Sequence, residues 1–184
     1  MAALLSPAAH AIIYFNAQEV DGDILLVGSG SIDLTGAVSS GSSPSSVSGV
    51  IYPDWGWLIL GPATLFDYYT VVSGPSFGAG SVIANPYGTG DHFGIMLDSN
   101  RLVVPVGYTS GAPLSGSTTF PDAAFADIGL SEGVYTWTFG SGENTDSIIL
   151  TVGNPAPVVP EPTTYALLGG VAALGFAAWR RRRA

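Results

Sequence analysis

Few residues in this chain have side chains able to do catalytic chemistry. The sequence has two histidines, His10 and His92, and no cysteine. On an extended strand Asp91 would point away from His92, so it could not orient that ring for general acid–base catalysis. The serines lack the Gly-x-Ser-x-Gly pattern that exposes a nucleophile. These residues favour a protein that is not an enzyme, although a carboxylate pair for glycan hydrolysis stays open because acids are numerous.

A metal site has weak support. Asp21 and Asp23 flank Gly22 and are the candidate ligands for Ca²⁺. The same Asp-Gly step between two apolar segments is a strong signal for a two-residue hairpin turn, and we favour that explanation. Zinc at His92 would need three carboxylates beside one imidazole, which is unusual. We therefore expect no cofactor, with calcium as the alternative.

Two tryptophans could bind a sugar. Trp55 and Trp57 share a parity, so on an extended strand both rings would lie on one face. Such a pair could stack on a sugar ring, or it could be part of the hydrophobic core. We favour the core. Rings found on the surface would favour a carbohydrate-binding module instead.

The charge is divided between the body and the C-terminus. Thirteen acidic residues and a single base, Arg101, precede residue 159, so the body carries a net charge of about −12, and the sequence has no lysine. Binding to nucleic acid depends on lysines and arginines that neutralise phosphates. The composition therefore excludes nucleic acid as a partner.

The pattern of the body is that of an all-β domain. Residues 12–20 and 23–34 are rich in strand formers and flank Asp21-Gly22, which predicts a hairpin. Residues 133–139 alternate between aromatic residues and Val or Thr, and residues 147–152 form the last expected strand. Short strands at this spacing predict one antiparallel β-sandwich or jelly-roll-like domain.

The segments between these strands are expected to be loops, with one exception. Residues 35–49 and residues 110–117 are rich in Gly, Ser and Pro, which predicts exposed connections. Residues 123–130 carry the one helical signal of the body. A proline-rich segment begins at residue 154, so we place the end of the domain at residue 153.

The N-terminus has the pattern of the second half of a signal peptide. Residues 1–11 are apolar and end in Ala9-His10-Ala11, where Ala9 and Ala11 match the small-x-small site of signal peptidase. We expect cleavage after Ala11, with a start codon further upstream or a fragment that was cut short; an ordinary N-terminus is the alternative.

The C-terminal segment predicts a membrane helix. Residues 165–179 are apolar on every side, and as a helix they would span roughly 22 Å, somewhat less than a bilayer core of about 30 Å. Residues 163–164 and the arginines close part of that gap. A buried core helix is the alternative, but it should show a polar face. The residues that follow would stop the chain on the cytoplasmic side: Arg180, Arg181, Arg182 and Arg183.

Together, three features resemble the PEP-CTERM sorting signal of Gram-negative bacteria that make exopolysaccharide. Val159-Pro160-Glu161-Pro162, a short apolar segment and a terminal arginine cluster follow one another in that order. The resemblance implies recognition by an exosortase, a membrane-embedded cysteine transpeptidase, with Pro160, Glu161 and Pro162 as the recognised motif. The helix would then be a temporary anchor in the inner membrane, because the tail is removed.

These expectations give a complete plan of the chain. We expect a partial signal peptide (1–11), a β-sandwich ectodomain (12–153), a linker with the motif (154–164), a transmembrane helix (165–179) and a basic cytoplasmic tail (180–184). The function we favour is that of an exported, non-catalytic protein of the cell surface or exopolysaccharide matrix. A carbohydrate-binding module, with or without calcium, is the alternative, and a secreted glycan hydrolase is the third choice.

Overall fold

The structure is a computed structural model that describes residues 11–35, 37–43, 46–70, 73–85, 87–140 and 145–153. These residues lie in one compact unit, which spans residues 1–154. The predicted linker, transmembrane helix and basic tail, and all of the predicted signal peptide except Ala11, lie outside the described residues. Within the described ranges, no helix is long and apolar enough to cross a membrane.

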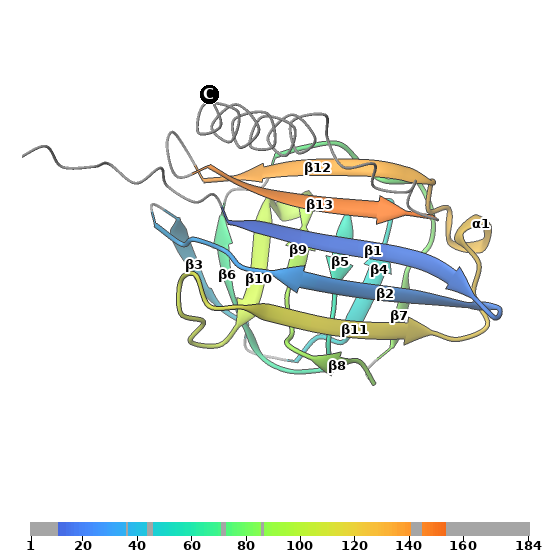
Figure 1. Ribbon diagram of the computed structural model, residues 1–184, viewed down its shortest axis with the longest axis horizontal. Helices are drawn as coiled ribbons and strands as arrows, with labels where there is room; N and C mark the ends of the chain where they lie inside the picture. The colour runs from blue at the N-terminus through green and yellow to red at the C-terminus, as the bar shows by residue number, and fades with distance from the viewer. Residues whose placement is uncertain are drawn as a thin grey trace, which may run out of the picture. The chain divides into compact units, whose positions relative to one another are not determined.

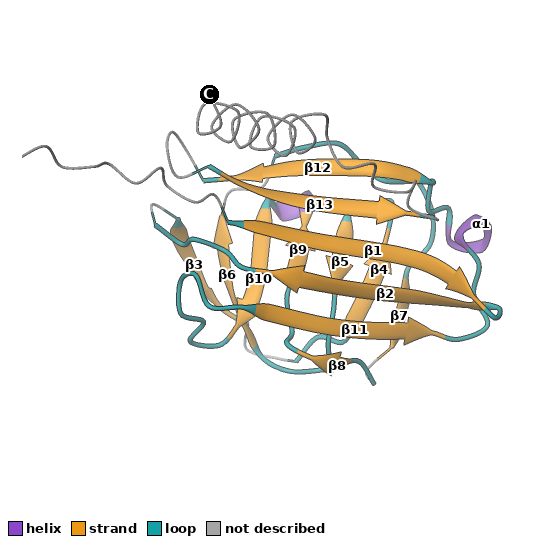
Figure 2. Ribbon diagram, viewed as in Figure 1, coloured by secondary structure: helices purple, strands orange, loops and turns teal. Residues whose placement is uncertain are grey.

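Strands make up most of this unit (Figure 2). The helical elements are the short α1 (Phe125–Ile128) and the 3₁₀ turn η1 (Leu97–Ser99). The strands are β1 (Ile12–Val20), β2 (Asp23–Gly30), β3 (Val38–Ser42), β4 (Gly49–Tyr52), β5 (Trp57–Ile59), β6 (Phe66–Thr70), β7 (Ile83–Asn85), β8 (Thr89–Gly90), β9 (Gly94–Met96), β10 (Arg101–Pro105), β11 (Leu114–Phe120), β12 (Gly133–Phe139) and β13 (Asp146–Val152).

The strands form two layers that face each other (Figure 1). One sheet has the order β12-β13-β1-β2-β11-β8, and the other has the order β3-β6-β10-β9-β5-β4-β7. In Figure 1 the strands of the two sheets run crosswise, as in orthogonally packed sandwiches. The predicted all-β, two-layer class is confirmed. One pairing between the named strands, β1 with β13, is parallel, which makes the first sheet mixed.

The main core fills the space between the two sheets. In β1 the alternating residues Ile13, Phe15 and Ala17 are buried, as the period of two in a strand requires. Trp137 on β12 is fully buried in the same core. Because both inner faces are apolar, the sandwich is held together by burial of hydrophobic surface without any disulfide.

The predicted hairpin at Asp21-Gly22 is confirmed. Both residues have positive φ values, 54° and 91°, as a type I′ turn requires. Oδ1 of Asp23 accepts a hydrogen bond from the backbone N–H of Asp122 at 3.0 Å. Among the described residues there is no group of three or more His, Cys, Asp or Glu side chains that could hold a metal ion. Calcium binding by Asp21 and Asp23, the alternative to the turn explanation, stays untested.

Two of the loop predictions, for residues 35–49 and 110–117, are wrong in part. Residues 38–42 form the edge strand β3, whose Ser40 and Ser42 hydroxyls hydrogen-bond to Thr70 and Asp67 on β6. Residues 114–117 belong to β11. There a Cβ on Gly116 would lie 2.8 Å from the carbonyl oxygen of Asp91, so the close approach of a neighbouring segment explains this glycine.

The strand predicted for residues 23–34 ends early. β2 stops at Gly30, where φ is +143° and a Cβ would lie 2.0 Å from the carbonyl oxygen of Ile12. Ile32 is nevertheless buried in the core, and its backbone N–H donates to the hydroxyl of Tyr108 at 3.1 Å.

The outer face of the seven-stranded sheet carries a second apolar cluster. Its buried members are Val50, Ile59, Phe66, Met96 and Val103, and the half-buried side chains packed against them are Val47, Tyr52, Trp57 and Tyr68. Both faces of the central strands are therefore apolar, and the aromatic rings of the outer face are the surface from which a binding site can be built.

Candidate functional site

One row of side chains crosses the outer face of the seven-stranded sheet. Tyr52 lies opposite Trp57, Trp57 opposite Met96, and Met96 opposite Arg101. Directly paired residues of antiparallel strands share a face, so these four side chains lie side by side over β4, β5, β9 and β10. The guanidinium of Arg101 lies 4.3 Å from the centre of the Tyr68 ring, in a cation–π contact.

The turn between β4 and β5 holds the next aromatic residue, Trp55. The backbone N–H of Gly56 donates to the carbonyl of Pro53 at 3.2 Å, which closes the turn. Gly56 has φ +68°, and a Cβ there would lie 2.7 Å from the side chain of Leu97. Only glycine satisfies both conditions without strain.

The same turn is fixed to η1 by two backbone hydrogen bonds. The N–H of Leu97 donates to the carbonyl of Gly56, and the N–H of Asp98 donates to the carbonyl of Trp55, both at 3.1 Å. The position of Trp55 is therefore determined by two hairpins, β4–β5 and β9–β10, that lie next to each other in the sheet.

The prediction that Trp55 and Trp57 lie in the core is wrong for Trp55, which is 48% exposed. Its ring stacks on Tyr52, with centroids 5.0 Å apart and planes 15° apart, and it meets Trp57 edge-on at 5.6 Å. The parity argument failed because Trp55 belongs to a turn and only Trp57 belongs to a strand. One side of the Trp55 ring is covered by Tyr52, and much of the rest faces solvent.

A carboxylate holds the second indole. Oδ1 of Asp98 accepts hydrogen bonds from Nε1 of Trp57 at 2.8 Å and from the hydroxyl of Ser99 at 3.0 Å. Within the part of the chain that the structure describes, Oδ2 of Asp98 has no protein donor. This oxygen is free to accept a hydrogen bond from a ligand.

Trp55 and Asp98 line a cavity of about 360 Å³, which we call the Trp55 pocket. Its lining residues are Asp54, Trp55, Gly56, Gly74, Ser76, Leu97 and Asp98. The volume falls within the range of small-molecule sites, roughly 300–1,000 Å³. The pocket offers a flat aromatic platform and two carboxylates as acceptors, which suits reversible binding of a hydroxylated molecule.

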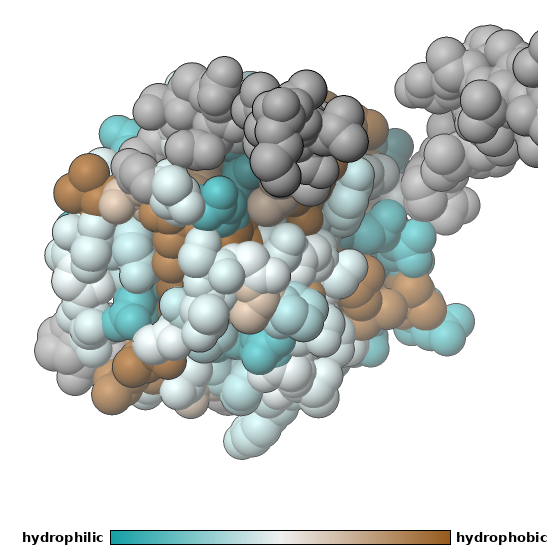
Figure 3. Space-filling model, turned by 60° about the vertical axis from the view of Figure 1, so that its left-hand side comes forward, coloured by the Kyte–Doolittle hydropathy of each residue, from teal (hydrophilic) through white to brown (hydrophobic). Residues whose placement is uncertain are grey.

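Three other large aromatic side chains lie outside the Trp55 pocket. Trp137 is fully buried, and its Nε1 donates to the carbonyl of Pro75 at 2.9 Å. Tyr69 packs against the main core, and Tyr68 lies under Arg101. In Figure 3 the hydrophobic residues form separate groups with polar residues between them, so this view shows no continuous hydrophobic face.

His92 is buried against the second sheet. It is 2% exposed, its ring centroid lies 5.5 Å from that of Phe66, and its Nδ1 lies 3.0 Å from the carbonyl oxygen of Pro62. The carbonyl accepts, so Nδ1 carries the proton. Burial lowers the pKa of His92, opposed by its hydrogen bond to Pro62. Asp91 is engaged separately, since its Oδ2 accepts from the backbone N–H of Ser115 at 2.9 Å.

His92 makes the stability of the domain depend on pH. Its pKa is lower in the folded than in the unfolded protein, where it is about 6.5, so the unfolded protein binds more protons below that pH. We expect the free energy of unfolding to be highest above pH 6.5 and to fall on acidification, by at most about 1.4 kcal/mol per pH unit from this residue.

Urea unfolding at several pH values between 7.5 and 5 checks this expectation. The His92→Asn variant places an amide N–H near the position of Nδ1, where it can donate to Pro62, and it does not titrate, so its stability should change less over this range. Equal pH dependence in both proteins would contradict the role of His92.

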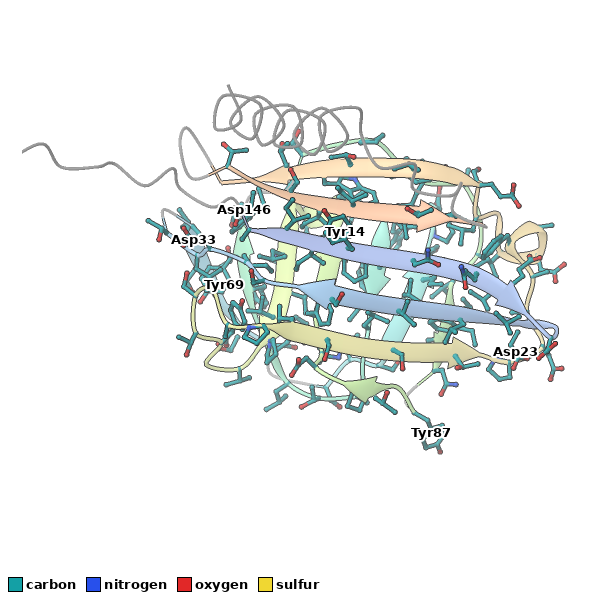
Figure 4. The ribbon with its side chains drawn as sticks, in the orientation of Figure 1. Tyr14, Asp23, Asp33, Tyr69, Tyr87 and Asp146 are labelled. Carbon is teal, nitrogen blue, oxygen red and sulfur yellow. The ribbon has the colours of Figure 1, made fainter. Side chains whose placement is uncertain are left out.

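A second group of carboxylates ties the ends of strands together. Asp146 is buried at the start of β13; its Oδ1 accepts from the N–H of Ala11 at 2.9 Å and its Oδ2 from the N–H of Asp33 at 2.8 Å. Hydrogen bonds from Thr35, and then from Ser110, lower the pKa of Asp33. Figure 4 shows Asp33 and Asp146 near one end of the unit and Asp23 at the other. The contacts of Asp146 are structural.

The comparison with known families concerns the C-terminus. Residues 158–183 match the PEP-CTERM protein-sorting motif. The match contains Pro160, Glu161, Pro162 and the four arginines, and the predicted resemblance is confirmed. No curated protein and no solved structure matches the chain. The motif implies recognition by an exosortase, export, and membrane-associated sorting to the cell surface.

Proposed function

We propose that this protein, which carries a PEP-CTERM motif, is a non-catalytic protein of the cell surface or exopolysaccharide matrix. The observation that carries the proposal is the sorting motif at residues 158–183. In this proposal the C-terminal segment is held for a time in the inner membrane and is then removed near Pro160-Glu161-Pro162. The β-sandwich is the part that acts at the surface.

The state of the titratable groups supports a role without catalysis. His92 is buried, uses its Nδ1 proton on Pro62 and has a lowered pKa, so it is a poor partner for proton transfer with an external substrate. Both oxygens of Asp146 accept backbone hydrogen bonds. The two acidic residues that line the Trp55 pocket, Asp54 and Asp98, lie beside the indole of Trp55, an arrangement suited to binding.

Carbohydrate binding is the second candidate function, and the surface position of Trp55 favours it. An indole that is half exposed and held in place by a turn, a stacked tyrosine and a neighbouring hairpin is pre-organised for stacking. Binding to the polysaccharide of the matrix would retain the protein where the sorting system delivers it, so the two candidate functions are compatible.

Incubation of the surface-released protein with the exopolysaccharide of its own producing cells tests the proposal. We expect the protein to sediment with the polymer and to release no new reducing ends. The control is an exported acidic protein of similar size and charge, which should stay in solution. Release of reducing ends would show that the protein is a hydrolase, and a protein that stays in solution would contradict a matrix role.

A further inference from the structure

We propose that the Trp55 pocket is a subsite for neutral, hydroxyl-rich glycans. The inference rests on the proposed function, because it assumes that the β-sandwich is delivered to a surface rich in polysaccharide. It adds the location of the site, the role of each group and the chemical class of the ligand.

The first argument is the shape of the aromatic surface. Tyr52 stacks on one side of Trp55, with the ring planes 15° apart, so the opposite side of the indole is left as a flat face and the two rings enclose no volume. A pyranose ring has an apolar face of C–H groups, which can lie flat on an indole. The contact buries apolar area of both the sugar and the indole. A cage for a cation would instead need rings on several sides of the charge.

The second argument is the set of hydrogen-bonding groups beside that face. Oδ2 of Asp98 and the carboxylate of Asp54 can only accept hydrogen bonds. A sugar hydroxyl is the matching donor, and a bond to an ionised acceptor is stronger than one between neutral groups. Ser76 lines the same pocket, although its hydroxyl already donates to the carbonyl of Gly78 at 2.8 Å.

The third argument is charge. Among the described residues that line it, the pocket has two carboxylates and no base, and the body as a whole carries about twelve negative charges. A glycan with uronate groups would meet like charges at close range, which is unfavourable. The single base of the body, Arg101, does not line the pocket and lies over Tyr68. Neutral sugar units are therefore favoured over uronate-bearing ones.

The fourth argument is that the site is rigid before a ligand arrives. Asp98 fixes the Trp57 ring, Gly56 permits the contact with Leu97, and two backbone bonds hold the turn to η1. A site that is already ordered loses little conformational entropy on binding. The pocket is open at the surface, which suits an internal stretch of a long chain as well as a chain end.

Isothermal titration calorimetry of the full chain tests the inference. The protein is kept in a detergent without sugar headgroups, and the ligands are oligosaccharides of neutral glucans, mannans and galactans, an oligouronate and a chitosan oligomer. We expect binding to at least one neutral series and weaker or absent binding to the oligouronate.

Variants then locate the site. Trp55→Ala should weaken binding of the preferred neutral ligand by roughly tenfold or more, since it removes the platform. Asp98→Asn keeps an acceptor for Trp57 but removes the charge, so it should weaken binding severalfold. Tyr87→Ala is the matched control, because Tyr87 is 86% exposed, does not line the pocket and points away from the unit in Figure 4. Thermal unfolding of each variant confirms that it is folded.

Three results would overturn the inference: no binding to any neutral series, a preference for the oligouronate or for chitosan, or a folded Trp55→Ala variant that binds as tightly as the wild type. Sedimentation with native exopolysaccharide separates the two levels of the proposal. If the wild type and Trp55→Ala sediment equally, the matrix role stands and the Trp55 pocket is not its site. If neither sediments, the matrix role fails, and the titration with neutral oligosaccharides decides the pocket separately.

Discussion

Replacing Pro160, Glu161 and Pro162 with alanine is expected to leave the protein uncleaved in the inner membrane. The three residues lie within the sorting motif at 158–183, and in the proposed pathway they are what the exosortase recognises. The apolar segment and the arginines remain in the variant, so insertion should proceed and only processing should fail. Fractionation of cells, with an antibody against the β-sandwich, measures the distribution; we expect at least roughly a tenfold rise in the membrane-to-surface ratio.

The linker provides a matched control. Pro155 and Pro157 lie just before the motif, and a variant with both replaced by alanine changes the stiffness of the same linker without touching the matched residues. It should be sorted normally. Normal surface delivery of the Pro160-Glu161-Pro162 variant would refute recognition of this motif, and equal retention of both variants would show that linker stiffness, and not the motif, is read.

Trp137→Ala is expected to destabilise the β-sandwich by about 3–5 kcal/mol. Trp137 is fully buried, its ring meets Phe77 edge-on at 5.8 Å, and its Nε1 donates to the carbonyl of Pro75. The variant loses the packing of the largest core side chain and leaves a cavity. Since small domains have a total stability of about 5–15 kcal/mol, much of the protein should unfold at moderate urea concentrations.

Val134→Ala, on the same strand, is the control for this experiment. Val134 is 68% exposed, so its replacement should change the stability by no more than about 0.5 kcal/mol. Trp137→Phe should fall between the two, because it keeps an aromatic ring but leaves the carbonyl of Pro75 without its donor. A Trp137→Ala variant as stable as the wild type would mean that this residue is not part of the core.

The features predicted correctly from the sequence are those encoded locally. Asp21-Gly22 specifies its turn because the two residues tolerate positive φ, and residues 133–139 alternate because one face of β12 is buried. The helical turn predicted within 123–130 is α1. In each case a few neighbouring residues carry the whole signal.

The features that were missed depend on neighbours distant in sequence. Residues 38–42 are a strand because β6 supplies partners for their backbone and serine hydroxyls, although the sequence reads as a loop. Gly116 lies in a strand because another segment passes too close for a side chain. Glycine and serine occur both in loops and in strands of this kind, and only the tertiary context decides which structure they adopt.

The candidate site could be predicted only in part. Trp55 and Trp57 were identified as a possible sugar platform, but the sequence does not show that a turn carries Trp55 to the surface. Asp98 is 41 residues away from Trp57, and its hydrogen bond exists because β5 pairs with β9. No local sequence pattern predicts such a long-range contact. The sorting motif, in contrast, is a continuous segment and is readable directly.

Mass spectrometry of the C-terminal peptide of the surface-released protein tests exosortase sorting most directly. We expect the mature chain to end near Pro160-Glu161-Pro162 and to lack the apolar segment and the four arginines that follow it. The same peptide from the inner-membrane fraction should still extend to Ala184. Surface protein that retains Arg180 to Arg183 would contradict processing at this motif.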